Sequence, residues 1–286
     1  MNARDAVERL CGDKVTGVRR GGGSICLVTL AGGEVVVAKQ GVGPGATAAE
    51  AAGLRWLGEH GDVRVPAVHG CDDEWLVMQY IPPASPSVEA AEDFGRGLAR
   101  LHLRGADAFG CPPPGGPADA WMGVAPMRNE PHEDWPTFYA RHRIEPYVRM
   151  CADQQLFTDD DVKVFDKLCE RLPEVAGPAE PPARLHGDAW SGNVHWSQDG
   201  VWLIDPAAHG GHREGDLALL QLFGTSLLDH ILGAYAEAAE DEGAPLDAGW
   251  RDRVPLHQLF PLLMHAAVFG GGYARQALSA ARASLP

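Results

Sequence analysis

The sequence predicts an α+β protein of two lobes, in which a small antiparallel β-sheet lobe with one helix precedes a larger and mainly helical lobe. Residues 14–40 contain apolar, β-branched segments separated by Gly-rich turns, a pattern typical of β-hairpins. After Pro82 and Pro83 the apolar residues recur at spacings of three and four, which is typical of amphipathic helices. The two prolines therefore mark the expected boundary between a first lobe of residues 1–81 and a second lobe of residues 82–286.

The first lobe is expected to contain five strands and one helix. A Gly-Gly-Gly turn at 21–23 joins the first two strands, and a Gly-rich loop at 41–45 precedes the helix at about 46–60. Thr47 and Glu50 have the spacing of a capping box at the start of that helix. The predicted strands span residues 14–20, 24–30, 35–39, 66–69 and 75–81.

The second lobe is expected to be built mainly from helices. The first of them opens at Ser85, and the spacing of Phe94, Leu98 and Leu101 places these side chains on one face. The Gly- and Pro-rich stretch at 105–134 is predicted to be a long loop. Further helices are predicted over residues 136–155, 158–172 and parts of 213–283, and short strands over 183–186, 194–196 and 201–204.

Composition and charge narrow the classes of function. The chain of 286 residues carries a formal net charge of −15, so it lacks the basic surface expected of a nucleic-acid-binding protein. No stretch approaches the ~18 apolar residues of a membrane span, and the N-terminus shows no apolar signal-peptide core. The six scattered cysteines form no Cys-x-x-Cys pair, which favours a reducing compartment. We therefore expect a cytoplasmic protein with no nucleic-acid or membrane partner.

An Asp, an Asn and a second Asp form the strongest functional pattern in the sequence. Asp188 is followed five residues later by Asn193, and Asp205 ends an apolar strand. Phosphoryl transfer needs one carboxylate that orients and deprotonates the attacking hydroxyl, and further oxygen ligands that hold Mg²⁺. This order and spacing predict Asp188 as the catalytic base, with Asn193 and Asp205 as metal ligands. Each residue taken alone is also a common turn former.

The first lobe supplies candidate nucleotide-binding residues. Gly22, Gly23 and Ser24 lie in a turn where backbone amides can approach phosphates, although a plain hairpin has the same composition. Lys39 ends an apolar strand, so its ammonium needs an anionic partner or must reach water. The phosphates of ATP and Glu50 are the candidate partners. The alternatives are a strand-end lysine that reaches solvent and a Glu50 that caps its own helix.

Gln79 and Ile81 follow the apolar strand segment Leu76-Val77-Met78. In this position, at the junction of the two predicted lobes, their backbone groups are expected to face the adenine base of a nucleotide. A simple edge strand would show the same pattern, so the sequence leaves both interpretations open.

Three segments carry a more specific signal. They are His-Gly-Asp-Ala-Trp-Ser-Gly-Asn at 186–193, Asp-Pro-Ala at 205–207 with Gly-His-Arg-Glu at 211–214, and Asp-Leu-Ala at 216–218 with Leu-Phe-Gly at 222–224. In this order they resemble the fructosamine kinase (ketosamine kinase) family, a branch of the protein-kinase-like phosphotransferases. The His-Gly-Asp-x-x-x-x-Asn pattern is shared with aminoglycoside and choline kinases, whereas the Trp-Ser-Gly insert and the Gly-His-Arg-Glu run narrow the resemblance.

The resemblance implies a two-lobed protein-kinase-like fold, with ATP and Mg²⁺ as cofactors. It implies transfer of the γ-phosphoryl group to a sugar hydroxyl of a ketosamine, an adduct of a reducing sugar with an amino acid or protein, and hence a role in deglycation. By position in the family pattern, Lys39 would bind phosphate and Trp190 would line the sugar side. Glu214 would either touch the substrate or fix its own loop through hydrogen bonds.

Two positions depart from the family pattern. Many members have Asn where this chain has Cys26, which we expect to be a small packed residue rather than a redox switch. Many members have aromatic residues where this chain has His209 and Gly210. The second change lies near the expected acceptor pocket, so His209 is a candidate substrate contact and the exact acceptor stays open.

Two other functions remain open. A small-molecule kinase of the aminoglycoside or choline type would show an acidic pocket for a polycation, which the net charge of −15 allows. A catalytically inactive, nucleotide-binding pseudokinase would have lost one of the residues Lys39, Asp188, Asn193 and Asp205, and all four are present. The sequence indicates neither the exact acceptor nor the oligomeric state.

Overall fold

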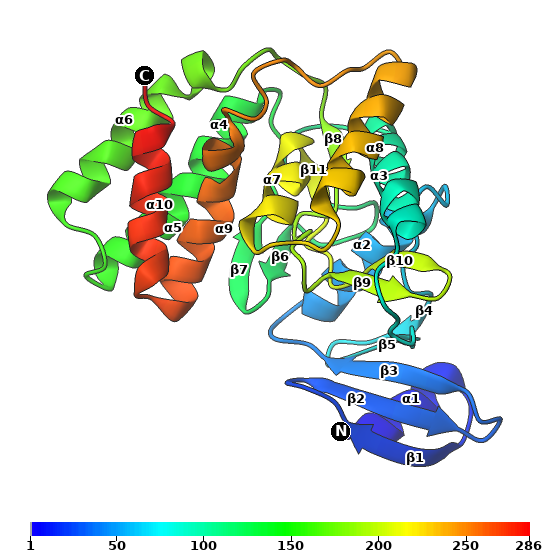
Figure 1. The fold of residues 1–286 in the computed structure, drawn as a ribbon. Coiled ribbons are helices and arrows are strands. Elements are labelled where there is room, and N and C mark those ends of the chain that lie inside the picture. Colours follow the sequence, from blue (N-terminus) through cyan, green and yellow to red (C-terminus); the bar gives the residue numbers. More distant parts are fainter. Residues whose placement is uncertain (1) are drawn as a thin grey trace.

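A five-stranded antiparallel sheet forms the first part of the computed structural model, which describes residues 2–286 (Figure 1). Its strand order is β1-β2-β3-β5-β4, so the last two strands exchange places relative to the chain. The five predicted strands are confirmed, with ends that shift by a few residues. Their bounds are β1 Val15–Arg20, β2 Ile25–Leu30, β3 Val35–Gln40, β4 Val68–Cys71 and β5 Trp75–Gln79.

A helix that the sequence analysis does not predict, α1 (Ala3–Cys11), packs on this sheet. Its buried side chains Ala3, Ala6 and Val7 form one small core with residues of β1, β2, β3 and β5. Together with Leu10 these side chains have the i, i+3, i+4, i+7 spacing of an amphipathic helix, a signal that the sequence analysis missed. The first lobe therefore has a second helix beside the predicted one.

The predicted helix of this lobe, α2 (Ala46–Gly58), has no side-chain cap at its start. The Thr47 hydroxyl instead donates to the backbone carbonyl of Asp72, and the Glu50 carboxylate accepts a hydrogen bond from Lys39 at 2.7 Å. The capping-box prediction is wrong, because both side chains have partners outside the helix.

Helices dominate the rest of the chain, as predicted (Figure 1). Helices α3 and α8 lie side by side, and α9 packs against α10 at the other end of the molecule. The Thr158 side chain begins α6 with a capping box. The helices are α3 Val88–Leu103, α4 Trp135–Tyr139, α5 Glu145–Asp153, α6 Asp159–Val175, α7 Glu214–Leu222, α8 Leu228–Asp241, α9 Val254–Phe269 and α10 Gly272–Ala283.

The single helix predicted over 136–155 is interrupted in the structure. A π-helical turn, Ala140–Ile144, lies between α4 and α5. The backbone amide of Glu145 donates to the carbonyl of Ala140, five residues earlier. A π-turn inserts one extra residue into the helical path and so rotates the side chains that follow it. The sequence pattern gives no sign of this insertion.

The predicted loop at 105–134 contains a hairpin of β6 (Asp119–Met122) and β7 (Ala125–Arg128), so this prediction is wrong in part. The hairpin touches the first lobe, because the Trp121 indole nitrogen donates to the Pro44 carbonyl at 3.1 Å. A side chain at Gly43 would lie 2.2 Å from the same indole. The glycine in the loop before α2 therefore makes room for the hairpin.

Four short strands build the centre of the second lobe in two antiparallel pairs, β9 with β10 and β8 with β11. The sequence predicts the first three of them, and β11 is an addition. The strands are β8 Ala183–Leu185, β9 Val194–Ser197, β10 Gly200–Leu203 and β11 His209–Gly211. The turns that follow β8 and β10 carry the residues of the predicted phosphoryl-transfer pattern.

The two lobes share buried surface. Trp56 and Leu57 of α2 belong to the same apolar core as Phe94 and Leu98 of α3. The division at residue 81 stays a prediction. None of the helices in residues 2–286 is both long and apolar enough to cross a membrane.

Candidate active site

The turn between β8 and β9 brings Asp188 and Asn193 together. The Asn193 side-chain nitrogen donates to the Asp188 backbone carbonyl at 2.8 Å and to its carboxylate at 3.0 Å. The same nitrogen lies 3.4 Å from the backbone carbonyl of Asp205, which follows β10. One amide group therefore ties together all three residues of the predicted pattern.

Asp216, in the first turn of α7, stabilises the turn between β8 and β9. Its fully buried carboxylate accepts hydrogen bonds from the backbone amides of His186 at 2.7 Å and Gly187 at 2.9 Å, and contacts the His102 imidazole at 3.3 Å. Gly187 has φ +81°, and a side chain there would lie 2.2 Å from the Ala207 carbonyl. The loop geometry therefore requires glycine before Asp188, and Asp216 acts as a structural anchor.

The Asp188 carboxyl group lies in an environment that disfavours its charge. Burial raises its pKa to about 8, against the hydrogen bond from Asn193, which lowers it. The negative charge of Asp216 raises this pKa further, and the Lys39 ammonium opposes the rise. A carboxyl group with such a pKa takes up a proton readily near neutral pH.

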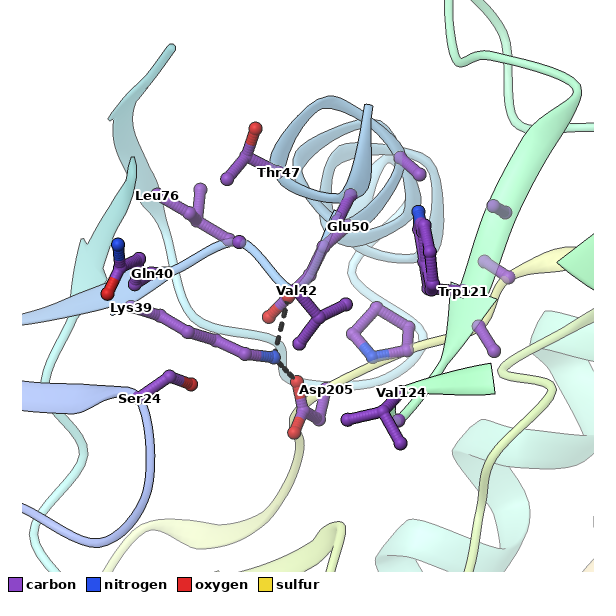
Figure 2. Close-up of a pocket in the computed structure, with 18 of the residues that line it drawn as sticks. Ser24, Lys39, Gln40, Val42, Thr47, Glu50, Leu76, Trp121, Val124 and Asp205 are labelled. Carbon is purple, nitrogen blue, oxygen red and sulfur yellow. Dashed lines mark hydrogen bonds and ion pairs between the residues drawn. The ribbon is translucent and has the colours of Figure 1, made fainter. Parts of the chain in front are cut away.

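Lys39 of β3 reaches two carboxylates at once (Figure 2). Its ammonium donates to Glu50 of α2 at 2.7 Å, and it also forms an ion pair with Asp205. The Lys39 and Glu50 side chains are mostly buried, whereas the Asp205 side chain is 45% exposed. The predicted ion pair of Lys39 with Glu50 is confirmed. Asp205 has φ +58°, an uncommon value for a residue other than glycine, and such residues cluster at functional sites.

Two cavities meet at the triad of Lys39, Glu50 and Asp205. The first has a volume of about 200 Å³ and is also lined by Ser24 and by Trp121 of the β6–β7 hairpin. The second has a volume of about 190 Å³ and is mainly apolar. Its other walls are Ile25, Leu27, Val37, Pro66, Met78, Gln79, Tyr80, Ile81, His195 and Ile204. A mainly apolar cavity thus lies next to one with charged walls.

The predicted nucleotide-binding residues fall around these cavities. Gln79 and Ile81 line the apolar one, and the Ile81 carbonyl contacts the His195 imidazole nitrogen Nε2 at 3.0 Å. Gly22 and Gly23 form the turn before β2 and do not line either cavity, whereas the neighbouring Ser24 does. The turn therefore brings only its last predicted residue to the cavity wall.

Trp190 presents a partly exposed ring two residues after Asp188. Its indole is 37% exposed and packs edge-on against Phe223 at 5.7 Å between ring centroids. A side chain at Gly192 would lie 2.3 Å from that indole. The Trp-Ser-Gly sequence thus holds a partly exposed apolar ring two residues after Asp188.

His209 and Glu214, the other predicted substrate contacts, are buried away from these two cavities. The His209 nitrogen Nδ1 lies 2.9 Å from the Ala207 carbonyl, and burial lowers the pKa of the imidazole to about 3. Glu214 accepts hydrogen bonds from Arg253 at 2.5 and 2.9 Å. Burial alone would raise its pKa, but the hydrogen bonds from His257 and Arg253 lower it to about 2.

The sequence analysis missed part of the site. The β6–β7 hairpin, with Trp121 and Val124, walls the first cavity although it was predicted as loop. The Trp-Met-Gly segment at 121–123 was the available signal, because an apolar pair before a glycine fits a hairpin as well as a loop. The His102 support of Asp216 lies 114 residues away in sequence, so no local pattern reveals it.

The fold is that of the protein-kinase-like class. The structure of a choline kinase from Streptococcus pneumoniae superposes on it with a TM-score of 0.67, covering 98% of this chain and 96% of the other. At 14% sequence identity, this likeness concerns the fold alone.

Closer relatives specify the family. The sequence model of the family described as fructosamine kinase matches residues 40–285, and the chain belongs to this family. It is 33% identical over 252 residues to a probable ketoamine kinase of Thermus thermophilus, covering 88% of this chain and 87% of the relative. It is 30% identical over 273 residues to the chloroplastic protein-ribulosamine 3-kinase of Arabidopsis thaliana, covering 91% and 79%. A crystal structure from Thermobifida fusca, named as a candidate fructosamine-3-kinase, has a TM-score of 0.91 and 44% identity, covering 99% and 98%.

Proposed function

We propose that this protein transfers the γ-phosphoryl group of ATP to a sugar hydroxyl of a ketosamine, such as a fructosyl or ribulosyl amine. The observation that carries the proposal is that Lys39, Glu50 and Asp205 line both cavities, while Asn193 joins the Asp205 backbone to Asp188, in a chain of the fructosamine kinase family. The relatives named ketoamine kinase and protein-ribulosamine 3-kinase support the acceptor class.

The apolar cavity suits the base of the nucleotide. Its aliphatic walls, among them Ile25, Met78 and Ile204, form a slot on one side of Lys39. With adenine in that slot, the phosphates reach the Lys39 ammonium, which Glu50 holds in place at 2.7 Å. A related choline kinase structure is a complex with AMP, which supports nucleotide use by this fold.

The residues present fit a magnesium ion. Asn193 commits its amide nitrogen to the Asp188 loop, and its amide oxygen is the hard ligand that Mg²⁺ prefers. The half-exposed Asp205 carboxylate is the second oxygen ligand. When bound, the ion neutralises charge on the phosphates. Asp205→Ala is expected to weaken magnesium-dependent nucleotide binding, and an unchanged magnesium dependence in this variant rejects the assignment.

Asp188 acts as the base in this proposal. The acceptor hydroxyl oxygen forms a bond to the γ-phosphorus while the bond from that phosphorus to the β–γ bridging oxygen breaks, and ADP leaves. The hydroxyl proton passes to the Asp188 carboxylate. Burial raises the pKa of this group to about 8, and a general base is most effective when its pKa lies near the working pH.

Trp190 is the proposed sugar contact. Its indole is partly exposed two residues after the proposed base, and apolar ring faces suit the C–H face of a sugar. His209 and Glu214 are proposed to act indirectly, because each is buried and bonded to other protein groups. Because neither residue is proposed to contact the acceptor, the amine portion of the ketosamine is expected to influence turnover less than its sugar portion does.

The test is an ATP-consumption assay with fructosyl-lysine, ribulosyl-lysine, free fructose, choline and an aminoglycoside side by side. We expect turnover with one or both ketosamines to exceed that with the other three acceptors. Higher turnover with choline or the aminoglycoside would replace this proposal with the small-molecule kinase. ATP binding without turnover of any acceptor would favour the inactive, nucleotide-binding alternative.

A further inference from the structure

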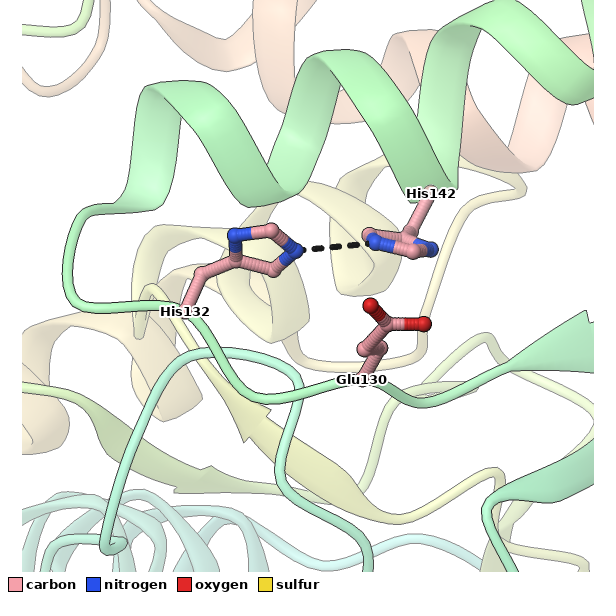
Figure 3. Close-up of side chains that lie close together, drawn as sticks. All are labelled: Glu130, His132 and His142. Carbon is pink, nitrogen blue, oxygen red and sulfur yellow. Dashed lines mark hydrogen bonds between the residues drawn. The ribbon is translucent and has the colours of Figure 1, made fainter.

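Glu130, His132 and His142 gather outside the proposed active site, where the segment after β7 meets the π-turn (Figure 3). The Nε2 atoms of the two imidazoles lie 2.9 Å apart. One donor atom from each of the three residues lies within 4.8 Å of the others. We propose that these side chains bind one divalent transition-metal ion of the zinc type.

The donor set suits such an ion. Two imidazole nitrogens and one carboxylate oxygen are a common set of protein ligands for zinc in sites that keep a further position open to water. Zinc–nitrogen bonds of about 2.0–2.1 Å in tetrahedral geometry separate two nitrogens by roughly 3.3 Å. The observed 2.9 Å between the two Nε2 atoms therefore needs only a small opening. Without a metal, one imidazole must donate a proton to the other to allow this approach.

The backbone around the ligands is already fixed. The His132 amide donates to the Phe109 carbonyl at 2.8 Å, and the Phe109 amide donates to the His132 carbonyl at 3.1 Å. On the other side, the buried Arg143 donates to the Arg128 carbonyl at 2.8 Å and to the Asn129 side-chain oxygen at 2.6 Å. Because the ligands rest on anchored segments, little ordering is required when a metal binds.

Arg143 also links the two segments directly. It directly follows His142 in the π-turn, and the groups that it contacts directly precede Glu130. The extra residue of this π-turn places His142 over the segment of His132, where the ring centroids lie 5.0 Å apart. Such π-turns occur often at functional sites.

The site is open to solvent on its carboxylate side. Glu130 is exposed, and the two imidazoles are partly buried. The Arg128 guanidinium lies 3.2 Å from Glu130 and competes with a metal for it, but it also pairs with Asp119 at 2.9 Å. Arg128 can therefore keep an acidic partner when Glu130 turns to the ion.

A second group in residues 2–286, His212, Glu214 and His257, has similar composition but a different character. All three residues are buried, and Arg253 already donates two hydrogen bonds to Glu214. A guanidinium thus occupies the place of the cation. The proposal concerns the first group only.

The experiment measures Zn²⁺ and Co²⁺ binding to the untagged, reduced, nucleotide-free full chain after treatment with a chelator. We compare the wild type with a His132→Ala/His142→Ala double variant by competition with a zinc indicator. The wild type is expected to bind one more equivalent of Zn²⁺ than the double variant. Each single histidine variant is expected to lose at least ~10-fold in affinity, because even indirect partners of metal ligands contribute ~10–100-fold.

His230→Ala is the matched control, since His230 is an exposed histidine that also contacts a glutamate, Glu92, at 3.1 Å. This variant is expected to bind zinc as the wild type does. A Co²⁺ absorption band in the visible range, present in the wild type and absent in the double variant, is expected as the signature of the site. Thermal melts without metal check that each variant folds.

Equal zinc stoichiometry in the wild type and the double variant would overturn the proposal, as would a Co²⁺ band that survives both substitutions. Loss of binding in His257→Ala instead would also overturn it. If the double variant fails to fold, the two single histidine variants decide the question. A Co²⁺ band that weakens in both supports the site, and a band that is unchanged in both, or absent from the wild type, refutes it.

Discussion

Asp188 and Glu214, two buried acidic residues of the second lobe, have pKa values that are shifted in opposite directions. Glu214 accepts two hydrogen bonds from Arg253 and its pKa is lowered to about 2. Asp188 has only an amide, Asn193, as its side-chain hydrogen-bond partner, and burial raises its pKa to about 8. Glu214 is therefore neutralised inside the protein, whereas the charge of Asp188 is left to be balanced by what enters the site. For these two residues the comparison teaches that Glu214, which has its own guanidinium, is committed to the fold, whereas Asp188, which has no cation as a hydrogen-bond partner in residues 2–286, is suited to chemistry.

The largest expected effect tests the role of Asp188 as the base. Asp188→Asn keeps the shape of the side chain but removes the proton acceptor. We expect kcat with a ketosamine to fall ~10²–10⁴-fold, the usual contribution of a positioned general base, while ATP binding is retained. Steady-state kinetics and a nucleotide-binding titration measure the two quantities. Asp199→Asn, in the turn between β9 and β10, is the control, and wild-type turnover in Asp188→Asn would reject the base assignment.

The next effect tests the contribution of Glu214 to the stability of the fold. Glu214→Gln removes the buried one of the two carboxylates that pair with Arg253, and the partly buried Asp247 remains at 2.9 Å. Breaking a buried pair costs up to about 3–5 kcal/mol in free energy of unfolding, and the remaining Asp247 is expected to keep the loss at the lower end of this range. Urea unfolding measures this loss. Asp160→Asn removes the exposed pair of Asp160 with Lys163 and should cost under ~1 kcal/mol. If Glu214→Gln proves as stable as the wild type but has a raised KM for the acceptor, Glu214 is a substrate contact after all.

A smaller effect tests Trp190 as the sugar contact. Trp190→Ala removes an indole that is 37% exposed and is expected to raise the KM for the ketosamine by ~10-fold. This corresponds to about 1.4 kcal/mol, a fraction of what burying a large apolar side chain contributes. The KM for ATP should not change, and Trp190→Phe should lie between the two. An equal rise in both KM values would place the indole in a general packing role instead.

The residues of the candidate site could be predicted from the sequence more completely than the elements that surround them. Asp188, Asn193 and Asp205 lie within 18 positions of one another, and strand–turn patterns predict their convergence. The partnership of Lys39 with Glu50 follows from the cost of an unpaired ammonium at an apolar strand end. By contrast, the fit of Trp121 against Gly43 is a tertiary contact, and the same residues are compatible with a loop.

Distance in sequence explains the remaining misses. Glu214 finds Arg253 only after 39 positions, so the sequence left its role open between substrate contact and loop anchor. The π-turn that carries His142 changes the helix by a single residue and leaves no apolar signal. The capping box failed because Thr47 and Glu50 each have a partner on another element, which local spacing cannot indicate.

The last expected effect is a pH dependence that separates buried histidines from exposed ones. Burial lowers the pKa of His209 to about 3, and the positive charge of Arg143 lowers it further, while the Ala207 carbonyl and the Asp216 charge oppose this. In the unfolded chain the pKa returns to about 6.5. Below that pH the unfolded state binds a proton that the folded state does not. The stability contributed by neutral His209 is therefore fully present above pH 6.5 and is lost as the pH falls toward 3.

For one such histidine the free energy of unfolding is expected to fall by up to about 1.4 kcal/mol per pH unit well below pH 6.5. Urea unfolding at intervals between about pH 7.5 and 5 measures the slope. His209→Gln keeps a side-chain donor for the Ala207 carbonyl but cannot take up a proton, so its slope should be shallower than that of the wild type. His60→Gln, at an exposed histidine beside Glu59, should leave the slope unchanged. Equal slopes in His209→Gln and the wild type would show that His209 titrates alike in the folded and unfolded chains, and its burial would then not distinguish it from a surface histidine.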